Sequence, residues 1–304
     1  MSEGAAATAM ARTPDHDVWT VLRLMKWSGE YLESKGVDRG RLDAEHLLAR
    51  ALGLPRLQLY LQYDRPLEQS ELDRFRPLLR RRAHREPLQY ILGRAAFREL
   101  DLKVDSRVLI PRPETEVLVD EVLAWAGGKE SLTALDLGTG SGAIGLSLLL
   151  EGPFRRAVAT DVSVDAVELA RENARDAGVE ERIEFRIGAL FDAVGVGESF
   201  DVVVSNPPYI AEGEASSLQP EVGLWEPADA LFGGPDGLSV VRAIVQGAGA
   251  VLKPMGLLAL EVGERQPEIV VGALEEVGEY DDVRIRRDLA GRQRVVLARR
   301  TGGT

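Results

Sequence analysis

Four consecutive residues, Asn206-Pro207-Pro208-Tyr209, combine an amide, two prolines and an aromatic ring directly after the apolar run Asp201 to Ser205. Proline cannot donate a hydrogen bond to a sheet, so two in succession end a strand and stiffen the chain that leaves it. We therefore expect the amide and the ring at the carboxyl end of a strand, where open α/β sheets bind ligands. A rigid turn closed by a buried Tyr is the structural alternative.

A glycine-rich stretch lies upstream, at the end of another apolar run: Asp136-Leu137-Gly138-Thr139-Gly140-Ser141-Gly142. Alternating glycines let the backbone turn tightly and let a ligand touch the main chain. The helix expected behind them offers free amides at its N-terminus. We expect Gly138, Thr139, Gly140, Ser141 and Gly142 to cradle a nucleotide or nucleoside. The pattern Gly140-x-Gly142-x-x-Gly145, taken alone, would indicate a dinucleotide.

Two further positions follow the next two expected strands. Asp161 ends the first of these, and an acidic residue there can accept hydrogen bonds from both ribose hydroxyls of NAD or of S-adenosylmethionine. Alternatively, Asp161 supplies charge at the N-terminus of a helix that Ser163 caps. Leu190 and Phe191 follow the second strand, and of the two we expect Leu190 to contact an adenine.

The amide and the prolines favour methyl transfer over hydride transfer, which has no use for them. The Asn206 side-chain oxygen and the Pro207 carbonyl can each accept one N–H of a planar nitrogen, which would aim its lone pair at a sulfonium methyl. Tyr209 would pack against the flat target group. No general base is needed before transfer, which agrees with all three histidines lying before residue 85. Asn206, Pro207 and Tyr209 are therefore the expected catalytic residues.

Composition limits the class of protein. An apolar content of 45% over 304 residues indicates a globular chain long enough for two domains. The absence of cysteine excludes disulfides, thiolate metal sites and cysteine nucleophiles, and we expect no metal. No signal-peptide core or membrane-length apolar run is present, so a cytoplasmic protein without membrane contact is expected.

Charge is distributed unevenly. Of the formal net charge of −12, residues 1–100 contribute +3 and residues 101–304 contribute −15. The acidic part argues against broad DNA binding, because phosphates need a basic surface, so we expect no direct nucleic-acid partner. The basic run Arg80, Arg81, Arg82 and Arg85 is interpreted either as a solvated helix end or as a patch facing RNA or an acidic partner.

Periodicity suggests four segments. Residues 1–16 are expected to be disordered, and residues 17–88 to form a helical domain that includes a helix over 71–84 capped by Ser70. Residues 89–112 alternate and predict a β-hairpin linker, with Tyr90 to Gly93 in its first part. Over 113–300, strands alternate with helices, which predicts a mainly parallel sheet covered on both faces. A tight final strand pair places an antiparallel strand at one edge.

The chain resembles the glutamine-N5 methyltransferases of peptide chain release factors over most of its length. The motifs that carry the resemblance are Tyr90 to Gly93, Leu109 to Glu116, Asp136 to Gly142, Ser205 to Ile210, Glu226-Pro227, Ala230 to Leu238 and Asp288 to Arg292. Asn-Pro-Pro-Tyr alone is shared with methyltransferases of DNA adenine, RNA guanine and other proteins. The joint occurrence of these motifs is far more selective.

The resemblance implies a Rossmann-like, seven-stranded class I methyltransferase domain with a small N-terminal helical bundle. It implies that residues 17–88 recognise the substrate and that residues 113–300 use S-adenosyl-L-methionine to methylate the glutamine of a Gly-Gly-Gln motif in release factors. It also implies that Asn206 contacts both cofactor and substrate and that Pro207, Pro208 and Tyr209 hold the glutamine amide. A monomer is expected. The main alternative is an adenine-N6 or other nucleic-acid or protein methyltransferase with the same amide clamp. An NAD-dependent dehydrogenase rests on the glycine pattern alone, and Asn206 with Tyr209 disfavours a non-catalytic binding module.

Overall fold

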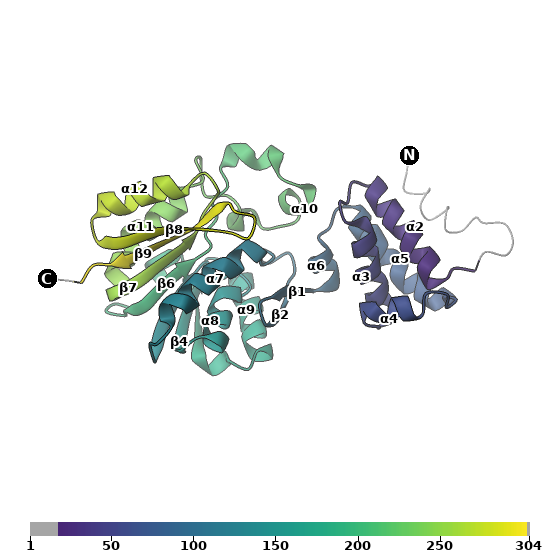
Figure 1. The fold of residues 1–304 in the computed structure, drawn as a ribbon, viewed down its shortest axis with the longest axis horizontal. Coiled ribbons are helices and arrows are strands. Elements are labelled where there is room, and N and C mark those ends of the chain that lie inside the picture. The colour runs from purple at the N-terminus through teal and green to yellow at the C-terminus, as the bar shows by residue number, and fades with distance from the viewer. Residues whose placement is uncertain (1–17, 303–304) are drawn as a thin grey trace. The chain divides into compact units, whose positions relative to one another are not determined.

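The structure is a computed structural model that describes residues 18–302 (Figure 1). The chain forms two compact units, one ending at Leu92 and the other beginning at Gly93. The segment 1–16, expected to be disordered, lies outside the described residues. Within residues 18–302 no helix is long and apolar enough to cross a membrane.

The N-terminal unit is a helical bundle. Its helices are α2 (Val21–Ser34), α3 (Gly40–Leu52), α4 (Arg56–Leu61), α5 (Gln69–Ala83) and α6 (Leu88–Leu92). Buried apolar side chains such as Leu24, Leu48 and Phe75 form its core. The prediction that Ser70 caps α5 is wrong: Glu68 is the cap, and its N–H donates to the Glu71 carboxylate at 2.9 Å. An acidic pair therefore starts the helix, with its cap two residues before the position where a hydroxyl was expected.

Part of the basic run of α5 is neutralised inside this unit. Arg82 is buried, and its Nε donates to Oδ2 of the buried Asp43 at 2.7 Å. Arg81 donates through Nε to Glu86 at 2.8 Å. These two arginines stabilise the bundle, so the interpretation as a basic patch does not extend to them.

The hairpin is shorter than predicted and begins later. It consists of β1 (Arg94–Phe97) paired with antiparallel β2 (Leu100–Lys103). Tyr90 to Leu92, expected in the hairpin, belong to helix α6 instead, whose Ile91 N–H donates to the Pro87 carbonyl at 3.1 Å. Gly93, with φ +73, ends that helix. A short apolar run fits a buried helical turn as well as a strand, and here packing against the bundle decides the outcome.

The second unit is built on a seven-stranded sheet with the order β5-β4-β3-β6-β7-β9-β8. Its strands are β3 (Leu132–Leu137), β4 (Phe154–Asp161), β5 (Ile183–Ile187), β6 (Phe200–Ser205), β7 (Leu252–Glu261), β8 (Tyr280–Arg287) and β9 (Gln293–Arg300). Its α-helices are α7 (Pro113–Ala126), α8 (Ala143–Glu151), α9 (Val164–Asp176), α10 (Pro220–Gly223), α11 (Ser239–Val251) and α12 (Pro267–Val277). The 3₁₀ turns η1 (Glu180–Arg182), η2 (Leu190–Ala193), η3 (Glu212–Ser217) and η4 (Ala228–Ala230) lie in the connections.

One strand of this sheet runs antiparallel to its neighbours, as predicted, but it is not at the edge. Strand β9 pairs antiparallel with both β7 and β8, which makes it second from the edge. The reason is burial: Val295 to Ala298 in β9 are buried and apolar, whereas β8 is partly exposed along its length. An interior position suits the first pattern and an edge position suits the second.

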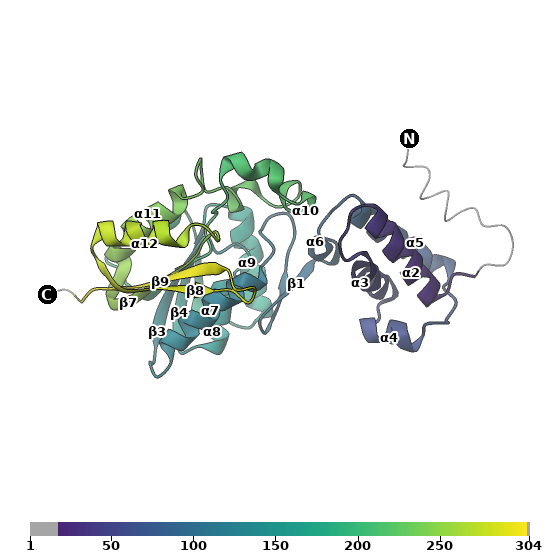
Figure 2. The same cartoon turned by 45° about the horizontal axis from the view of Figure 1, so that its top comes forward.

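Helices cover both faces of the sheet. Helices α7, α8 and α9 lie over one face, and α11 and α12 lie over the other (Figure 2). All residues of β3 are buried, as expected for a central parallel strand. From β3 the chain builds outward to β4 and β5 and then crosses to β6 on the other side. The carboxyl ends of β3 and β6 therefore form the point where open sheets of this kind bind ligands.

Candidate active site

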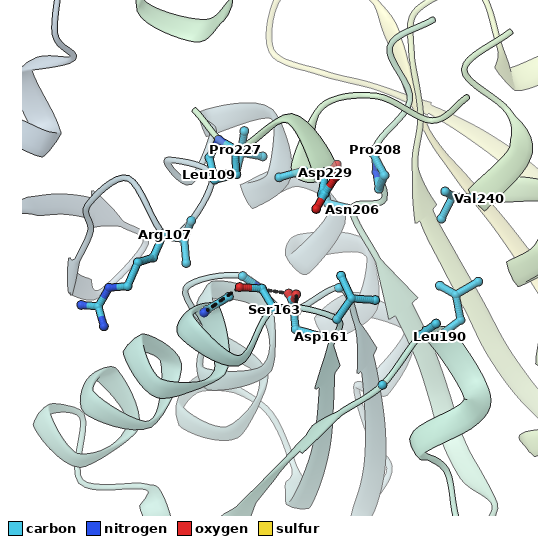
Figure 3. Close-up of a pocket in the computed structure, with 18 residues that line it drawn as sticks. Arg107, Leu109, Asp161, Ser163, Leu190, Asn206, Pro208, Pro227, Asp229 and Val240 are labelled. Atoms are coloured by element: carbon cyan, nitrogen blue, oxygen red, sulfur yellow. Dashed lines mark hydrogen bonds between the residues drawn. The ribbon is translucent and has the colours of Figure 1, made fainter. Parts of the chain in front are cut away.

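A cavity of about 370 Å³ opens at the carboxyl ends of β3, β4, β5 and β6 (Figure 3). Six of the residues expected in the site line it: Gly138, Gly140, Asp161, Leu190, Asn206 and Pro208. Asp161 lies on one side of the cavity and Asn206 with Pro208 on the other. Thr139, Ser141, Gly142, Pro207 and Tyr209 do not line it.

The glycine loop exposes main chain to the cavity. Gly138 and Gly140 have φ of +69° and +54°, and a Cβ added to either would meet no atom within 4 Å. The positive φ favours glycine at both positions, and the lack of side chains leaves the main chain open to the cavity. Gly142 differs: its added Cβ would lie 3.1 Å from Leu146, so it packs the start of α8.

A buried carboxyl at the end of β3 retains an unused acceptor. Asp136 Oδ2 accepts hydrogen bonds from Thr139 Oγ1 at 2.7 Å and from the Gly145 N–H at 3.1 Å. Its Oδ1 has no hydrogen-bond partner among the described residues. Burial raises the pKa of Asp136 to about 6. Asp136 is fully buried and does not line the cavity, so this unused acceptor lies behind the glycine loop.

Asp161 joins the glycine loop to helix α9. Its Oδ2 accepts the Gly140 N–H and its Oδ1 accepts the Ser163 N–H, both at 2.9 Å. The predicted cap of α9 is confirmed, because Ser163 Oγ accepts the Ala166 N–H at 3.1 Å. The carboxylate therefore supports the helix N-terminus and also borders the cavity, which leaves both interpretations of Asp161 compatible with the geometry.

Leu190 and Phe191 point to different places. Leu190 lines the cavity with φ +47°, an uncommon conformation for a bulky residue. Its carbonyl accepts a hydrogen bond from Thr160 Oγ1 at 3.3 Å. Phe191 packs against Gly247 of α11, where an added Cβ would collide with the ring.

The amide of Asn206 belongs to a buried hydrogen-bond chain. Its Nδ2 donates to Thr115 Oγ1 at 2.9 Å, and Thr115 Oγ1 donates to Glu261 Oε2 at 2.6 Å. Tyr209 Oη approaches the other carboxylate oxygen of Glu261 at 3.5 Å. Sequence reasoning did not single out Thr115 or Glu261. The available signals were that Thr115 lies inside the motif Leu109 to Glu116 and that Glu261 is the carboxyl that ends an apolar strand.

Burial dominates the electrostatics around Tyr209. It raises the pKa of Glu261 to about 7 and that of Tyr209 to about 12. The Arg294 guanidinium lies 5.9 Å from the centre of the Tyr209 ring and opposes both shifts. Tyr209 is therefore neutral at physiological pH, and Glu261 is poised between its two protonation states.

A second segment, residues 231–237, holds the acceptor loop, which we define as residues 206–210. We call this segment the clasp. The Ile210 N–H donates to the Leu231 carbonyl at 3.0 Å, and the Gly233 N–H donates to the Ile210 carbonyl at 2.9 Å. A Cβ added at Gly233 or Gly237 would collide with the carbonyl of Pro208 or Tyr209. The glycines of the motif Ala230 to Leu238 thus allow two stretches of backbone to touch.

An ion pair joins two walls of the cavity. Arg112 donates through Nη2 to Glu226 Oε2 at 2.5 Å, and the Glu226 side chain is 1% exposed. Burial raises the pKa of Glu226 to about 7, although Arg112 opposes the shift. This contact links the segment before α7, which includes Leu109, to the loop that contributes Pro227 and Asp229.

The sheet order, the glycine loop after β3 and the acid that ends β4 are the features of a class I methyltransferase. The fold matches that of the hMettl16 catalytic domain in complex with MAT2A 3'UTR hairpin 6, with a TM-score of 0.54, 17% identity, and coverage of 73% of this chain and 82% of that one. It also matches a methyltransferase from Pyrococcus furiosus, with a TM-score of 0.51, 22% identity, and coverage of 68% and 92%. These likenesses confirm the predicted fold class.

Sequence comparison gives the family. A PrmC N-terminal domain matches residues 23–93, and a methyltransferase small domain matches residues 113–222. The release factor glutamine methyltransferase of Geobacter sulfurreducens is 43% identical over 287 residues, which cover 94% of this chain and 99% of that protein. The protein of the same name from Chlorobaculum tepidum is 45% identical over 258 residues, or 82% and 87% of the two chains. The chain belongs to the release factor glutamine methyltransferase family, as the resemblance predicted.

Proposed function

We propose that this enzyme transfers the methyl group of S-adenosyl-L-methionine to the side-chain amide nitrogen, N5, of the glutamine in the Gly-Gly-Gln motif of release factors. The observation that carries the proposal is one cavity bordered by both the open glycine loop and Asn206. Family membership supports the choice of acceptor.

The residues around the glycine loop fit the cofactor. S-adenosyl-L-methionine supplies an electrophilic methyl group on a sulfonium. The stretch Gly138 to Gly142 would hold it through main-chain contacts, and Asp161 would accept hydrogen bonds from its ribose hydroxyls. The unused oxygen of Asp136 is an acceptor within the same strand end. Leu190 borders the cavity where the adenine is proposed to lie.

The acceptor loop would bind and orient the glutamine amide. Asn206 Oδ1 and the Pro207 carbonyl each accept one N–H of the amide, which fixes its lone pair and stabilises the charge that develops on nitrogen. Pro208 and Tyr209 flank the planar group. Tyr209 has a raised pKa of about 12 and takes no proton from the substrate. The proton on nitrogen leaves after transfer.

The remaining parts of the proposal concern partners and organisation. The N-terminal unit, which ends at Leu92, forms the substrate-recognition domain, residues 93–112 form the linker and residues 113–300 form the catalytic domain. The enzyme acts as a cytoplasmic monomer on a protein substrate, without binding nucleic acid or membrane. The net charge of −15 over residues 101–304 supports the exclusion of nucleic acid.

Mass spectrometry tests the proposal. A purified release factor is incubated with the enzyme and S-adenosyl-L-methionine, and its intact mass and peptides are measured. We expect one added methyl group on the Gly-Gly-Gln glutamine, and none on a factor in which that glutamine is replaced by glutamate. An unmethylated glutamine, with cofactor binding established by calorimetry, would contradict the proposal and direct the search to other proteins and nucleic acids.

A further inference from the structure

Two buried residues behind the acceptor loop have no role in the function described so far. Thr115 lies in the first turn of α7 and is 4% exposed, and Glu261 ends β7 and is 1% exposed. Neither lines the cavity. Asn206 nevertheless bonds to Thr115, and Thr115 bonds to Glu261, so both residues are connected to the amide that borders the cavity.

The orientation of the Asn206 amide matters for binding the acceptor. An asparagine amide has an acceptor oxygen and a donor NH₂ of nearly the same shape. Only the orientation with Oδ1 toward the cavity can accept an N–H from a substrate amide. The opposite orientation would set two donors against each other. The surrounding hydrogen bonds must therefore stabilise one of the two amide orientations over the other.

The hydrogens available along the hydrogen-bond chain determine the orientation of the Asn206 amide. A threonine hydroxyl has one hydrogen, and Thr115 gives it to Glu261 at 2.6 Å. While Glu261 is ionised it can only accept, so the direction of this bond is fixed in that state. Thr115 Oγ1 is then left as an acceptor, which Asn206 can satisfy only through Nδ2. We propose that Thr115 and Glu261 are positioning residues that hold Asn206 Oδ1 toward the acceptor amide, an inference that rests on the proposed function.

Protonation of Glu261 would reverse the chain. A carboxylic acid can donate to Thr115, whose hydrogen is then free to be donated to Asn206 Oδ1, and the amide turns its NH₂ to the substrate. The charged and titratable groups that face Glu261 are Tyr209 from the acceptor loop, Glu114 from α7 and Arg294 from β9, with Asp288 paired to Arg294 at 3.6 Å. Burial sets the pKa of Glu261 near 7, with Arg294 opposing and Glu114 reinforcing the shift. Methyl transfer should therefore weaken as pH falls through about 7. The substrate amide itself does not titrate in this range.

A matched pair of substitutions tests the role of Thr115. Thr115→Val removes the hydroxyl and keeps the shape, and Thr133→Val does the same at the other end of the sheet, where Thr133 is 9% exposed and donates to Asp201 at 2.8 Å. Both should lose about 1 kcal/mol of stability with the hydrogen bond. Only Thr115→Val should lower kcat, by about 100-fold, because the acceptor amide is no longer aligned. The Kd for S-adenosylhomocysteine, measured by calorimetry, should stay at the wild-type value in both.

Two further variants keep the test decisive. Thr115→Ser should restore most of kcat, since it returns the hydroxyl. Glu261→Gln cannot titrate, so its kcat should lose the acid limb near pH 7 that the wild type shows. An unimpaired Thr115→Val, or an acid limb that persists in Glu261→Gln, would overturn the positioning role while wild-type methylation stands. A wild-type enzyme that leaves the glutamine unmethylated would instead overturn the proposed function, and the positioning role with it.

Discussion

The two ends of the central sheet carry the same pair of groups in different electrostatic settings. At the amino end, Thr133 donates through N and Oγ1 to Asp201, both at 2.8 Å, and Lys253 Nζ donates to the same oxygen at 2.7 Å. At the carboxyl end, Thr115 donates to Glu261, and among residues 18–302 no cationic nitrogen forms an ion pair with that carboxylate. The first carboxylate is neutralised by contact, and the second is not.

The pKa values follow this difference. Partial burial opposes ionisation of Asp201, but the bonds from Lys253 and Thr133 outweigh it and lower the pKa. Burial of Glu261 outweighs the opposing effects of Thr115, Tyr209 and the more distant Arg294, and its pKa rises to about 7. The amino end is thus arranged for stability. The carboxyl end keeps a costly buried charge, which is the arrangement expected where a group acts on its neighbours.

The largest expected effect breaks the comparison at the carboxyl end. Asn206→Ala removes the proposed amide clamp and should abolish methyl transfer while S-adenosylhomocysteine binding remains measurable by calorimetry. Lys253→Met at the amino end is the control: it should lower stability by about 1 kcal/mol and leave the rate unchanged. Near-normal transfer by Asn206→Ala would show that the clamp mechanism is wrong.

A smaller loss is expected from the clasp. Gly237→Ala places a methyl group against the Tyr209 carbonyl and should lower kcat/KM by about 100-fold, because the acceptor loop shifts. Gly278→Ala has the same left-handed backbone, φ +71° against +74°, but its added Cβ has no atom closer than 4.0 Å. Both should lose the stability that a left-handed backbone costs an alanine, and Gly237→Ala should lose more because its methyl group also clashes. Equal kinetic losses in the two variants would refute the contact with the acceptor loop.

The smallest effects sharpen the comparison and concern stability against pH. The folded pKa of Glu261 lies above its ordinary value, so folding binds a proton and the free energy of unfolding falls as pH rises from about 4.5 to about 7. Asp201 has a lowered pKa and contributes stability that is lost on acidification. At pH 8, Glu261→Gln should therefore raise the melting temperature and Asp201→Asn should lower it, each by about 2–4 °C per kcal/mol. Shifts of the same sign would contradict the contrast between the two ends.

How much the sequence predicted depends on whether the determinants are local. The alternation of strands and helices predicted over 113–300 is present, since apolar runs and prolines mark the ends of elements such as Phe200–Ser205 and Pro267–Val277. Gly138 and Asn206 likewise reach one cavity because both follow central parallel strands. Tyr90 to Leu92 were misassigned, because a run that short takes the conformation its packing favours.

The hydrogen bonds that link Asn206, Thr115 and Glu261 could not be predicted from the sequence for a different reason. Asn206 and Glu261 lie 91 and 146 positions after Thr115, and no local sequence pattern links the three residues. Their meeting depends on α7 lying against β7, and the position of β9 depends in the same way on which strand is more deeply buried. A threonine at the start of a helix has many uses, and only the three-dimensional arrangement selects one.

The clasp fixes the position of the acceptor loop without fixing the side chains of the segment 211–230, which we call the excursion. Both ends of the excursion 211–230 are tied by backbone bonds, the Glu212 N–H to the Gly234 carbonyl at 3.2 Å and the Ile210 N–H to the Leu231 carbonyl. Main-chain bonds of this kind tolerate almost any side chain on the tied segment. Side chains of the excursion that neither line the cavity nor pair with Arg112 can therefore change without disturbing Asn206. These side chains beside the cavity can therefore change while the position of Asn206 in the cavity stays the same.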